Sequence, residues 1–320
     1  MAQHFLLSAA ARTLSVKEIY KAGEEAAYET FCKLRWSETN GEAVCPRCGG
    51  WETYKITTRR KFKCKACYHQ FSVTSGTIFA SRKLDFTDLL AAICLFVSNA
   101  KGMSSIQFSR TLDVQYKTAW VMAHKLREAF SRETDGATLD DEVEVDGAYF
   151  GGHIRPENKK EDRKDRRLKE NQTGKRRVVV AFRERFGRTL TFVRRSEAEG
   201  VDIAMNILDR DTALFADEAS HWDVLEGHFE TARINHSELY SEGHGKHTNW
   251  VESYFSRLRR MVSGQHHMVS PKYLYQYANH AAWIEDHREE NNKALTFRAL
   301  RNALLSPVSR EFKGYWQKSA

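Results

Sequence analysis

The sequence predicts a multidomain α+β protein in which a small cysteine-rich domain, a three-helix domain and a mixed sheet flanked by helices follow one another. Its 320 residues exceed one average domain, so several hydrophobic cores are expected. Two close cysteine pairs lie between residues 41 and 80, apolar residues recur at helical spacing over 84–132, and strand-like alternation begins near residue 142. This change of period separates a helical part from a sheet-containing part.

Composition and charge indicate a globular protein with a polyanionic partner. Apolar residues make up 41% and charged residues 29% of the chain, as in ordinary folded proteins. A formal net charge of +8 and a pI near 9.1 favour nucleic acid as the partner. The first residues lack the features of a signal peptide, and no apolar run reaches membrane-spanning length. We therefore expect a cytoplasmic protein with no membrane partner.

An N-terminal helical segment is expected over residues 1–40. Within it, residues 15–36 place apolar side chains at helical spacing, so one face of a helix can pack on the rest of the protein. The side chains predicted to share this face are Ile19, Ala26, Ala27, Phe31 and Leu34. We interpret this helix as a packing element.

Four of the six cysteines form two matched pairs, with the spacing C-x2-C-x15-C-x2-C. Each pair can turn tightly enough to place two thiolates on one tetrahedral ion, and the residues between the pairs can form a hairpin. Four thiolates leave no open position for chemistry, so the ion should stabilise the fold. The sequence therefore predicts a zinc ribbon over residues 41–80, with these structural zinc ligands: Cys45, Cys48, Cys64 and Cys67.

Basic residues in two segments are candidate DNA contacts. Arg59 and Arg60 lie on the hairpin between the cysteine pairs, where they form either a phosphate-contacting surface or an ordinary solvated face. Residues 84–132 resemble a helix-turn-helix domain, although three-helix cores are also common without DNA. Its last helix, from about 115 to 130, would direct three basic residues toward DNA: Lys117, Lys125 and Arg127.

A sheet domain is predicted over residues 140–290. Alternating or apolar runs indicate strands at 142–152, 176–184, 188–195 and 212–218, and helical spacing indicates helices at 200–210 and 249–263. This order predicts a mixed sheet with helices packed on it. Residues 153–176 are a charged insertion with almost no apolar side chains, expected to be a solvated loop. Residues 291–320 are expected to form a helical C-terminal tail.

Three acidic residues of the sheet domain are candidate metal ligands. Phosphodiester chemistry with two metal ions needs carboxylates that converge from neighbouring strands and a nearby helix. Asp146 lies inside an alternating strand, where an ionised side chain is a poor strand former, and Asp217 ends a buried strand. Glu252 lies at the start of the next helix.

Each of these acids also has a structural interpretation. Asp146 precedes Gly147 and would suit a residue beside a turn, whereas Asp217 would suit the N-cap of a helix that follows it. Asn249 and Glu252 have the spacing of a capping box, so the residues alone leave Glu252 open between a cap and a ligand.

Five segments, taken in their order along the chain, resemble the zinc-ribbon insertion-sequence transposases of bacteria: "CPRCGG", "FKCKACYHQFSVTSGTIFASRKL", "VEVDGAYFGG", "LFADEASHW" and "HTNWVESYFSRLRR". The resemblance runs from about Cys45 to His287. Proteins of this kind carry a DDE-type catalytic domain with a ribonuclease-H-like fold. The resemblance therefore implies such a fold here, with a zinc ribbon and a helix-turn-helix domain before it.

The resemblance also implies roles for individual residues. Asp146 and Asp217 would bind two catalytic Mg²⁺ ions, with Mn²⁺ as a substitute. The third position falls in "HTNWVES", where Glu252 is preferred because a carboxylate neutralises divalent charge better than an amide, and Asn249 is held in reserve. Arg259, seven residues after Glu252, resembles the basic residue that contacts DNA phosphate in many DDE enzymes.

The function expected from this resemblance is DNA transposition in the bacterial cytoplasm, in association with the nucleoid. The protein would bind the terminal inverted repeats of an insertion sequence, cut the DNA strand and join it to target DNA, acting as a homodimer or larger assembly during synapsis. Two alternatives share many of its features. One is a domesticated DNA-binding regulator with an inactive catalytic domain, and the other is a metal-dependent nuclease without strand transfer.

Overall fold

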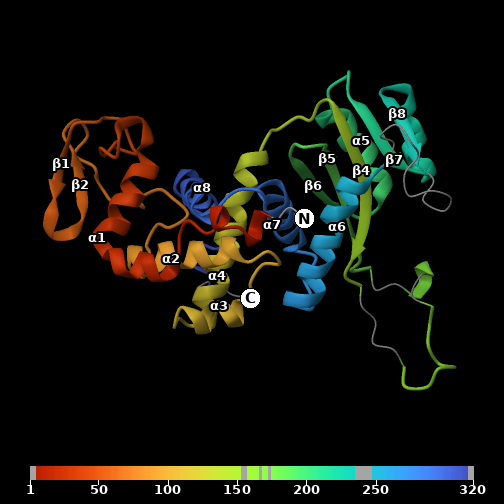
Figure 1. The fold of residues 1–320 in the computed structure, drawn as a ribbon, viewed down its shortest axis with the longest axis horizontal. Helices are drawn as coiled ribbons and strands as arrows, with labels where there is room; N and C mark the ends of the chain where they lie inside the picture. The colour runs from red at the N-terminus through yellow and green to blue at the C-terminus, as the bar shows by residue number, and fades with distance from the viewer. Residues whose placement is uncertain (1–4, 153–156, 166–167, 172–173, 235–246, 316–320) are drawn as a thin grey trace. The chain divides into compact units, whose positions relative to one another are not determined.

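The computed structural model describes residues 5–152, 157–165, 168–171, 174–234 and 247–315, and the chain divides into two compact units (Figure 1). The helical unit comprises Met1–Glu133 and His287–Ala320, and the sheet unit comprises Thr134–Asp286. The chain therefore leaves the helical unit once and returns to it. The segments predicted as 1–40, 41–80, 84–132 and 291–320 all fall largely or wholly within the helical unit, and their division into separate domains stays a prediction.

The first helix of the helical unit is α1 (Val16–Arg35), as predicted. It begins with a capping box, in which Glu18 donates its backbone N–H to Ser15 Oγ at 3.1 Å and the Ser15 N–H is donated to Glu18 Oε2 at 2.8 Å. A positive φ of 80° at Gly23 interrupts the helix. Behind this kink Ala26 is exposed, contrary to the expected apolar face, and Tyr28 is buried instead.

The zinc ribbon is a three-stranded antiparallel sheet in the order β1-β2-β3. Its strands are β1 (Thr53–Ile56), β2 (Lys61–Cys64) and β3 (Gln70–Phe71). Phe62 of β2 pairs with Phe71 of β3, and the centroids of their rings lie 5.7 Å apart. Trp36, which ends α1, packs edge-on against Phe62 at 5.4 Å. This aromatic cluster gives the small sheet a core of its own beside the cysteines.

The remaining helices of this unit are α2 (Phe86–Ser98), α3 (Ser105–Thr111), α4 (Tyr116–Phe130) and α8 (Asn292–Leu305). The first three confirm the helical pattern read from residues 84–132. Helix α8 comes from the predicted C-terminal tail and packs on α1, α2 and α4. The tail thus contributes to the core of the helical unit. A helix-turn-helix function for α3 and α4 stays a prediction.

The sheet unit contains the predicted mixed sheet, with strand order β6-β5-β4-β7-β8. The strands are β4 (Glu142–Phe150), β5 (Arg177–Glu184), β6 (Thr189–Arg194), β7 (Ala213–Asp217) and β8 (Glu230–Ile234). Strands β4, β5 and β6 are antiparallel, whereas β7 and β8 run parallel to β4 and β7 respectively. Strand β4 ends where Gly151 and Gly152 take positive φ angles of 78° and 68°. Strand β8 was not predicted.

Helices cover both faces of this sheet. On one face, α5 (Gly200–Ile207) and the 3-10 helix Ser220–Gly227 pack against an apolar core formed by alternate residues of β4, β5 and β7. On the other face, α6 (Asn249–Arg260) contacts β4 and β5, and α7 (Leu274–Asp286) contacts β6 (Figure 1). Of the charged insertion 153–176, residues 157–165 are exposed, whereas 153–156, 166–167 and 172–173 lie outside the described residues.

Candidate active site

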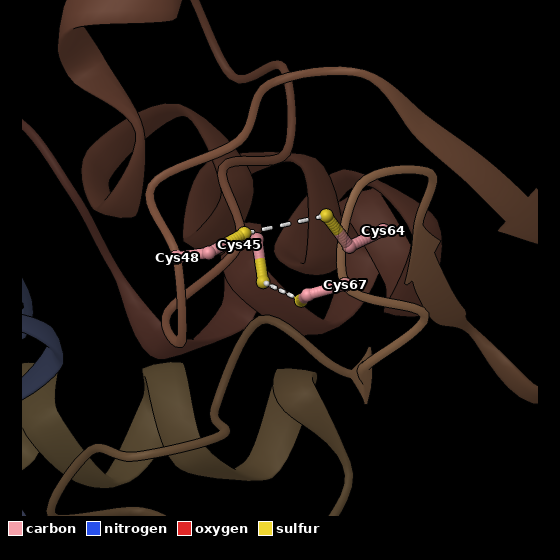
Figure 2. Close-up of side chains that lie close together, drawn as sticks. All are labelled: Cys45, Cys48, Cys64 and Cys67. Atoms are coloured by element: carbon pink, nitrogen blue, oxygen red, sulfur yellow. Dashed lines mark hydrogen bonds between the residues drawn. The ribbon is translucent and has the colours of Figure 1, made fainter.

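The four predicted zinc ligands converge in the ribbon (Figure 2). The Sγ atoms of Cys45 and Cys67 lie 3.6 Å apart, as do those of Cys48 and Cys64. Tetrahedral zinc with Zn–S bonds of about 2.3 Å places its sulfurs about 3.8 Å apart, so this spacing fits the ion. A backbone N–H of Cys67 lowers the pKa of the Cys64 thiol to about 7, whereas hydrogen bonds with the other three cysteines raise the pKa of the Cys48 thiol to about 12 despite a backbone N–H of Gly50. The two thiols titrate as a pair, and zinc binding requires both to lose their protons.

The two predicted aspartates meet at one edge of the large sheet. Strands β4 and β7 are parallel, and Val145 of β4 pairs with Ala216 of β7. The next residue on each strand is an aspartate, so Asp146 and Asp217 lie side by side. Asp217 Oδ1 accepts the N–H of Ala219 at 3.2 Å, but the following 3-10 helix begins after Ala219, so Asp217 is not its N-cap.

A third carboxylate, Glu197, joins these aspartates and was missed by the sequence interpretation. One ligand oxygen of each of Asp146, Glu197 and Asp217 lies within 4.8 Å of the others. Glu197 opens the 3-10 helix Glu197–Glu199, which precedes α5. In the capping box of this turn Ser196 pairs with Glu199, so the side chain of Glu197 is available to the cluster.

Gly147 makes room for Glu197. A Cβ atom at residue 147 would lie 2.4 Å from Glu197 Oε1, closer than atoms can approach. Strand β4 continues through this position to Phe150, so the sequence Asp-Gly marks a close approach between two segments and not a turn. The glycine inside the strand, directly after Asp146, was therefore a sequence signal that another segment approaches here, although it does not identify Glu197 as the approaching residue.

Burial and mutual repulsion shift the titration of this cluster. Burial raises the pKa of Asp146 to about 6, with the charge of Asp217 adding to the effect and Arg259 opposing it. Burial likewise raises the pKa of Glu197 to about 7, and both aspartates add to it. Carboxylates held together against their own repulsion are stabilised by protons or by a cation, and a divalent cation with oxygen ligands suits this set.

Helix α6 brings the remaining candidates to the same face. Glu252 is not a member of the three-carboxylate cluster, although its charge raises the pKa of Asp146. Thr248, not Asn249, is the N-cap residue of α6, so the capping box that was the alternative interpretation of Asn249 and Glu252 does not form. Asn249 is exposed as the first residue of the helix. Arg259 is exposed near the other end of α6, with its guanidinium 5.7 Å from the ring centroid of Phe255.

The other candidate DNA contacts differ in exposure. Arg59 and Lys117 are exposed. Arg60 is ion-paired with Glu24 at 2.7 Å and with Glu25 at 3.1 Å.

Of the two other basic candidates on α4, one lies at the margin of the helix and the other inside the helical unit. Lys125 is half-buried, and burial lowers its pKa. Arg127 is only 1% exposed, with its guanidinium 5.3 Å from the ring centroid of Phe96. The expectation that Arg127 faces DNA is therefore wrong, because its side chain lies inside the helical unit and does not reach the surface.

Comparison with known proteins identifies domains in both parts of the chain. Residues 138–286 match the ISXO2-like transposase domain, and residues 22–70 match the transposase zinc-ribbon domain. Together the two matches cover more than half of the chain. No curated protein and no solved structure matches it significantly. Among the described residues, no helix is both long enough and apolar enough to cross a membrane.

Proposed function

The chain belongs to the zinc-ribbon insertion-sequence transposases, and on this premise we propose that it binds the terminal inverted repeats of its element and catalyses DNA strand cleavage and strand transfer. The observation that carries this proposal is the convergence of Asp146, Glu197 and Asp217 at one edge of the mixed sheet. A sheet of this order with helices on both faces is also what a ribonuclease-H-like catalytic domain requires, and we assign that fold to the sheet unit.

The cluster fits a divalent metal because its oxygens lie close together and burial disfavours their charges when no cation is present. We assign Asp146, Asp217 and Glu197 as ligands of one ion. Glu252, whose charge reaches Asp146, is the proposed additional ligand for a second ion, with Asn249 as its alternative. Bound there, two Mg²⁺ or Mn²⁺ ions supply Lewis acidity that activates the attacking oxygen and neutralises charge at the phosphate.

Each proposed chemical step exchanges one P–O bond for another. In the first, a water oxygen attacks phosphorus at the end of the element, and the bond to the 3′-oxygen breaks to give a free 3′-hydroxyl. In the second, this hydroxyl attacks a phosphodiester of the target DNA, whose own P–O bond then breaks. The protein's task is to position these groups and balance charge. Arg259 is suited to contact a phosphate beside the carboxylates, since its charge reaches Asp146.

We propose that double-stranded DNA is held by the ribbon and by helix α4. Arg59 and Lys117 are the exposed basic residues that support this assignment, and Lys125 contributes at the margin of α4. Arg60 joins them only if DNA displaces its two glutamate partners. Cutting and joining two element ends requires at least two copies of the active site, so a homodimer or larger assembly is proposed during synapsis on the nucleoid.

A cleavage and joining assay tests this function. Purified protein is incubated with DNA that carries the inverted repeats flanking its reading frame, a target plasmid, and Mg²⁺ or Mn²⁺. We expect nicked repeat ends and joined products. Tight binding without any cleavage would support a DNA-binding regulator, and cleavage without joined product would support a nuclease.

A further inference from the structure

A second carboxylate on β4, Glu144, is buried on the face of the sheet that carries α6. Its side chain is 0% exposed. It lies two residues before Asp146, and because side chains alternate along a strand, Glu144 and Asp146 share a face. Its hydrogen-bond partners therefore lie on the α6 face of the sheet. They come from the turn between β5 and β6 and from the start of α6 with the residue that leads into it.

The contacts of Glu144 converge on the first turn of α6. Its Oε2 accepts the backbone N–H groups of Trp250 at 2.8 Å and Val251 at 3.0 Å. Its Oε1 accepts Nε of Arg185 at 2.9 Å and lies 3.1 Å from Nδ1 of His247. Arg185 also donates to the backbone carbonyl of His247 at 2.8 Å. One buried carboxylate thus binds both the helix and the residue that leads into it.

Glu144 of β4 caps the N-terminus of α6, as an N-cap side chain of the helix itself would do. An N-cap side chain accepts the second or third N–H of its helix, and Trp250 and Val251 supply these two groups in α6. Thr248 occupies the N-cap position without capping them itself. A carboxylate also suits the positive end of a helix dipole, and Arg185 balances its charge. The start of α6 is therefore fixed directly to β4.

We infer that Glu144, with Arg185 and His247, is a positioning residue that sets the placement of Glu252 relative to Asp146. Glu252 is one residue beyond Val251, and Asp146 is two residues beyond Glu144, so the clamp joins the strand and the helix next to the proposed ligands. A shift of α6 by one residue would move Glu252 by about 1.5 Å along its axis. Misplacement of about 1 Å can cost about 10²-fold in rate. The inference rests on the proposed function.

The test compares Glu144→Gln with Glu142→Gln in the full chain. Glu142 is a matched control because it lies on the same strand and face and also pairs with Arg185, at 2.6 Å, but its side chain is 52% exposed. Two readouts need no catalysis: Mn²⁺ affinity measured by electron paramagnetic resonance, and hydrogen exchange of amides in residues 249–255. The third is the Mn²⁺ concentration for half-maximal DNA cleavage.

For Glu144→Gln we expect faster exchange in 249–255, Mn²⁺ affinity weaker by about tenfold or more, and a matching rise in the half-maximal Mn²⁺ concentration, because residues that orient metal ligands typically contribute about 10–100-fold to metal affinity. Glu142→Gln should resemble the wild type in all three. Unchanged exchange and Mn²⁺ affinity in Glu144→Gln, or equal changes in both variants, would overturn the inference. So would a fall in the cleavage rate at saturating Mn²⁺ with no change in affinity, which a purely structural role would produce.

If Glu144→Gln does not fold, Arg185→Lys replaces it, because lysine keeps the charge but loses the second donor that holds His247. A smaller shift in the same direction is expected, and wild-type exchange and Mn²⁺ affinity would overturn the inference. Wild-type protein that binds Mn²⁺ but neither cuts nor joins DNA would refute the proposed function, while the exchange and affinity readouts would still decide the role of Glu144.

Discussion

Replacing Gly147 with alanine is expected to displace Glu197 from the carboxylate cluster while leaving the fold intact. The added Cβ would lie 2.4 Å from Oε1 and 2.5 Å from Cδ of Glu197. The atoms that must move belong to the far end of a flexible side chain, which can turn into another rotamer. Gly147 lies in the extended strand β4 and does not have a positive φ angle, so alanine can adopt its backbone conformation without strain.

The expected effects on stability and activity differ in size. A glycine-to-alanine change at a compatible position stabilises by about 0.4–1 kcal/mol through the unfolded chain. This offsets the roughly 0.5–1.5 kcal/mol of an imperfect rotamer at Glu197, so the melting temperature should change by only a few degrees. Loss of one preorganised charged group from an active site typically lowers kcat by about 10²–10³. Gly147→Ala should therefore match Glu197→Gln in DNA cleavage, measured with Mn²⁺ and alongside thermal unfolding.

The double variant and a matched control sharpen this test. Gly147→Ala combined with Glu197→Gln should be no worse than either change alone, because both remove the same carboxylate. Gly187→Ala creates a similar clash, with its Cβ 2.2 Å from Oε2 and 2.6 Å from Cβ of Glu184, which is not in the cluster. This control should lose stability and keep its activity. Wild-type cleavage by Gly147→Ala would refute the assignment of Glu197.

The remaining predictions concern the aspartates, helix α6, zinc and pH. Asp146→Asn and Asp217→Asn should each abolish cleavage and leave DNA binding nearly unchanged in a gel-shift assay. Glu252→Gln should lower cleavage more than Asn249→Ala does, and the opposite order would make Asn249 the ligand. Cys64→Ser should lose stoichiometric zinc by metal analysis and unfold the ribbon, as chelation should in the wild type. Burial holds the pKa of Asp146 in the folded protein at about 6, above the ordinary value of an aspartate. The metal-free protein should therefore lose stability as the pH rises from about 4 through 6, because the folded state resists losing this proton. Chemical unfolding measured across this pH range should show a smaller loss of stability for Asp146→Asn.

The aspartates could be predicted because each breaks a local pattern. Asp146 is charged inside an alternating strand, and Asp217 ends an apolar one, so each needs a reason that packing does not give. Their meeting follows from the parallel pairing of β4 and β7. Glu197 breaks no such pattern, because the charged turn before α5 has an ordinary polar composition. Its role depends on where that turn crosses β4, which only the tertiary structure specifies.

Helix α4 shows the limit of reading function from charge alone. Its apolar periodicity predicted the helix, but Arg127 is 1% exposed and packs over Phe96. A basic residue on the buried face of an amphipathic helix cannot be told from one at its margin without knowing what covers that face. In the structure, α8 packs against α4, and its sequence lies far along the chain. Strand β8 was missed for a related reason, because its residues at the sheet edge carry no alternating pattern.

The start of α6 explains why Glu252 is available to a metal site despite its capping-box spacing. In a capping box the glutamate folds back onto the N–H of its own N-cap residue. Here the helix begins one residue earlier than that pairing requires, with Thr248 as N-cap, and Glu144 takes the N–H groups of Trp250 and Val251. Since the N–H groups of the first turn are satisfied from β4, Glu252 is not needed to cap them, and its Oε1 accepts instead the hydroxyl of the N-cap residue Thr248 at 3.3 Å. Glutamine at position 252 keeps an oxygen that can accept the Thr248 hydroxyl, so Glu252→Gln should change the free energy of unfolding by no more than about 0.5 kcal/mol. Glu144→Gln should lower the free energy of unfolding, because it weakens the buried hydrogen bonds to Trp250, Val251 and Arg185.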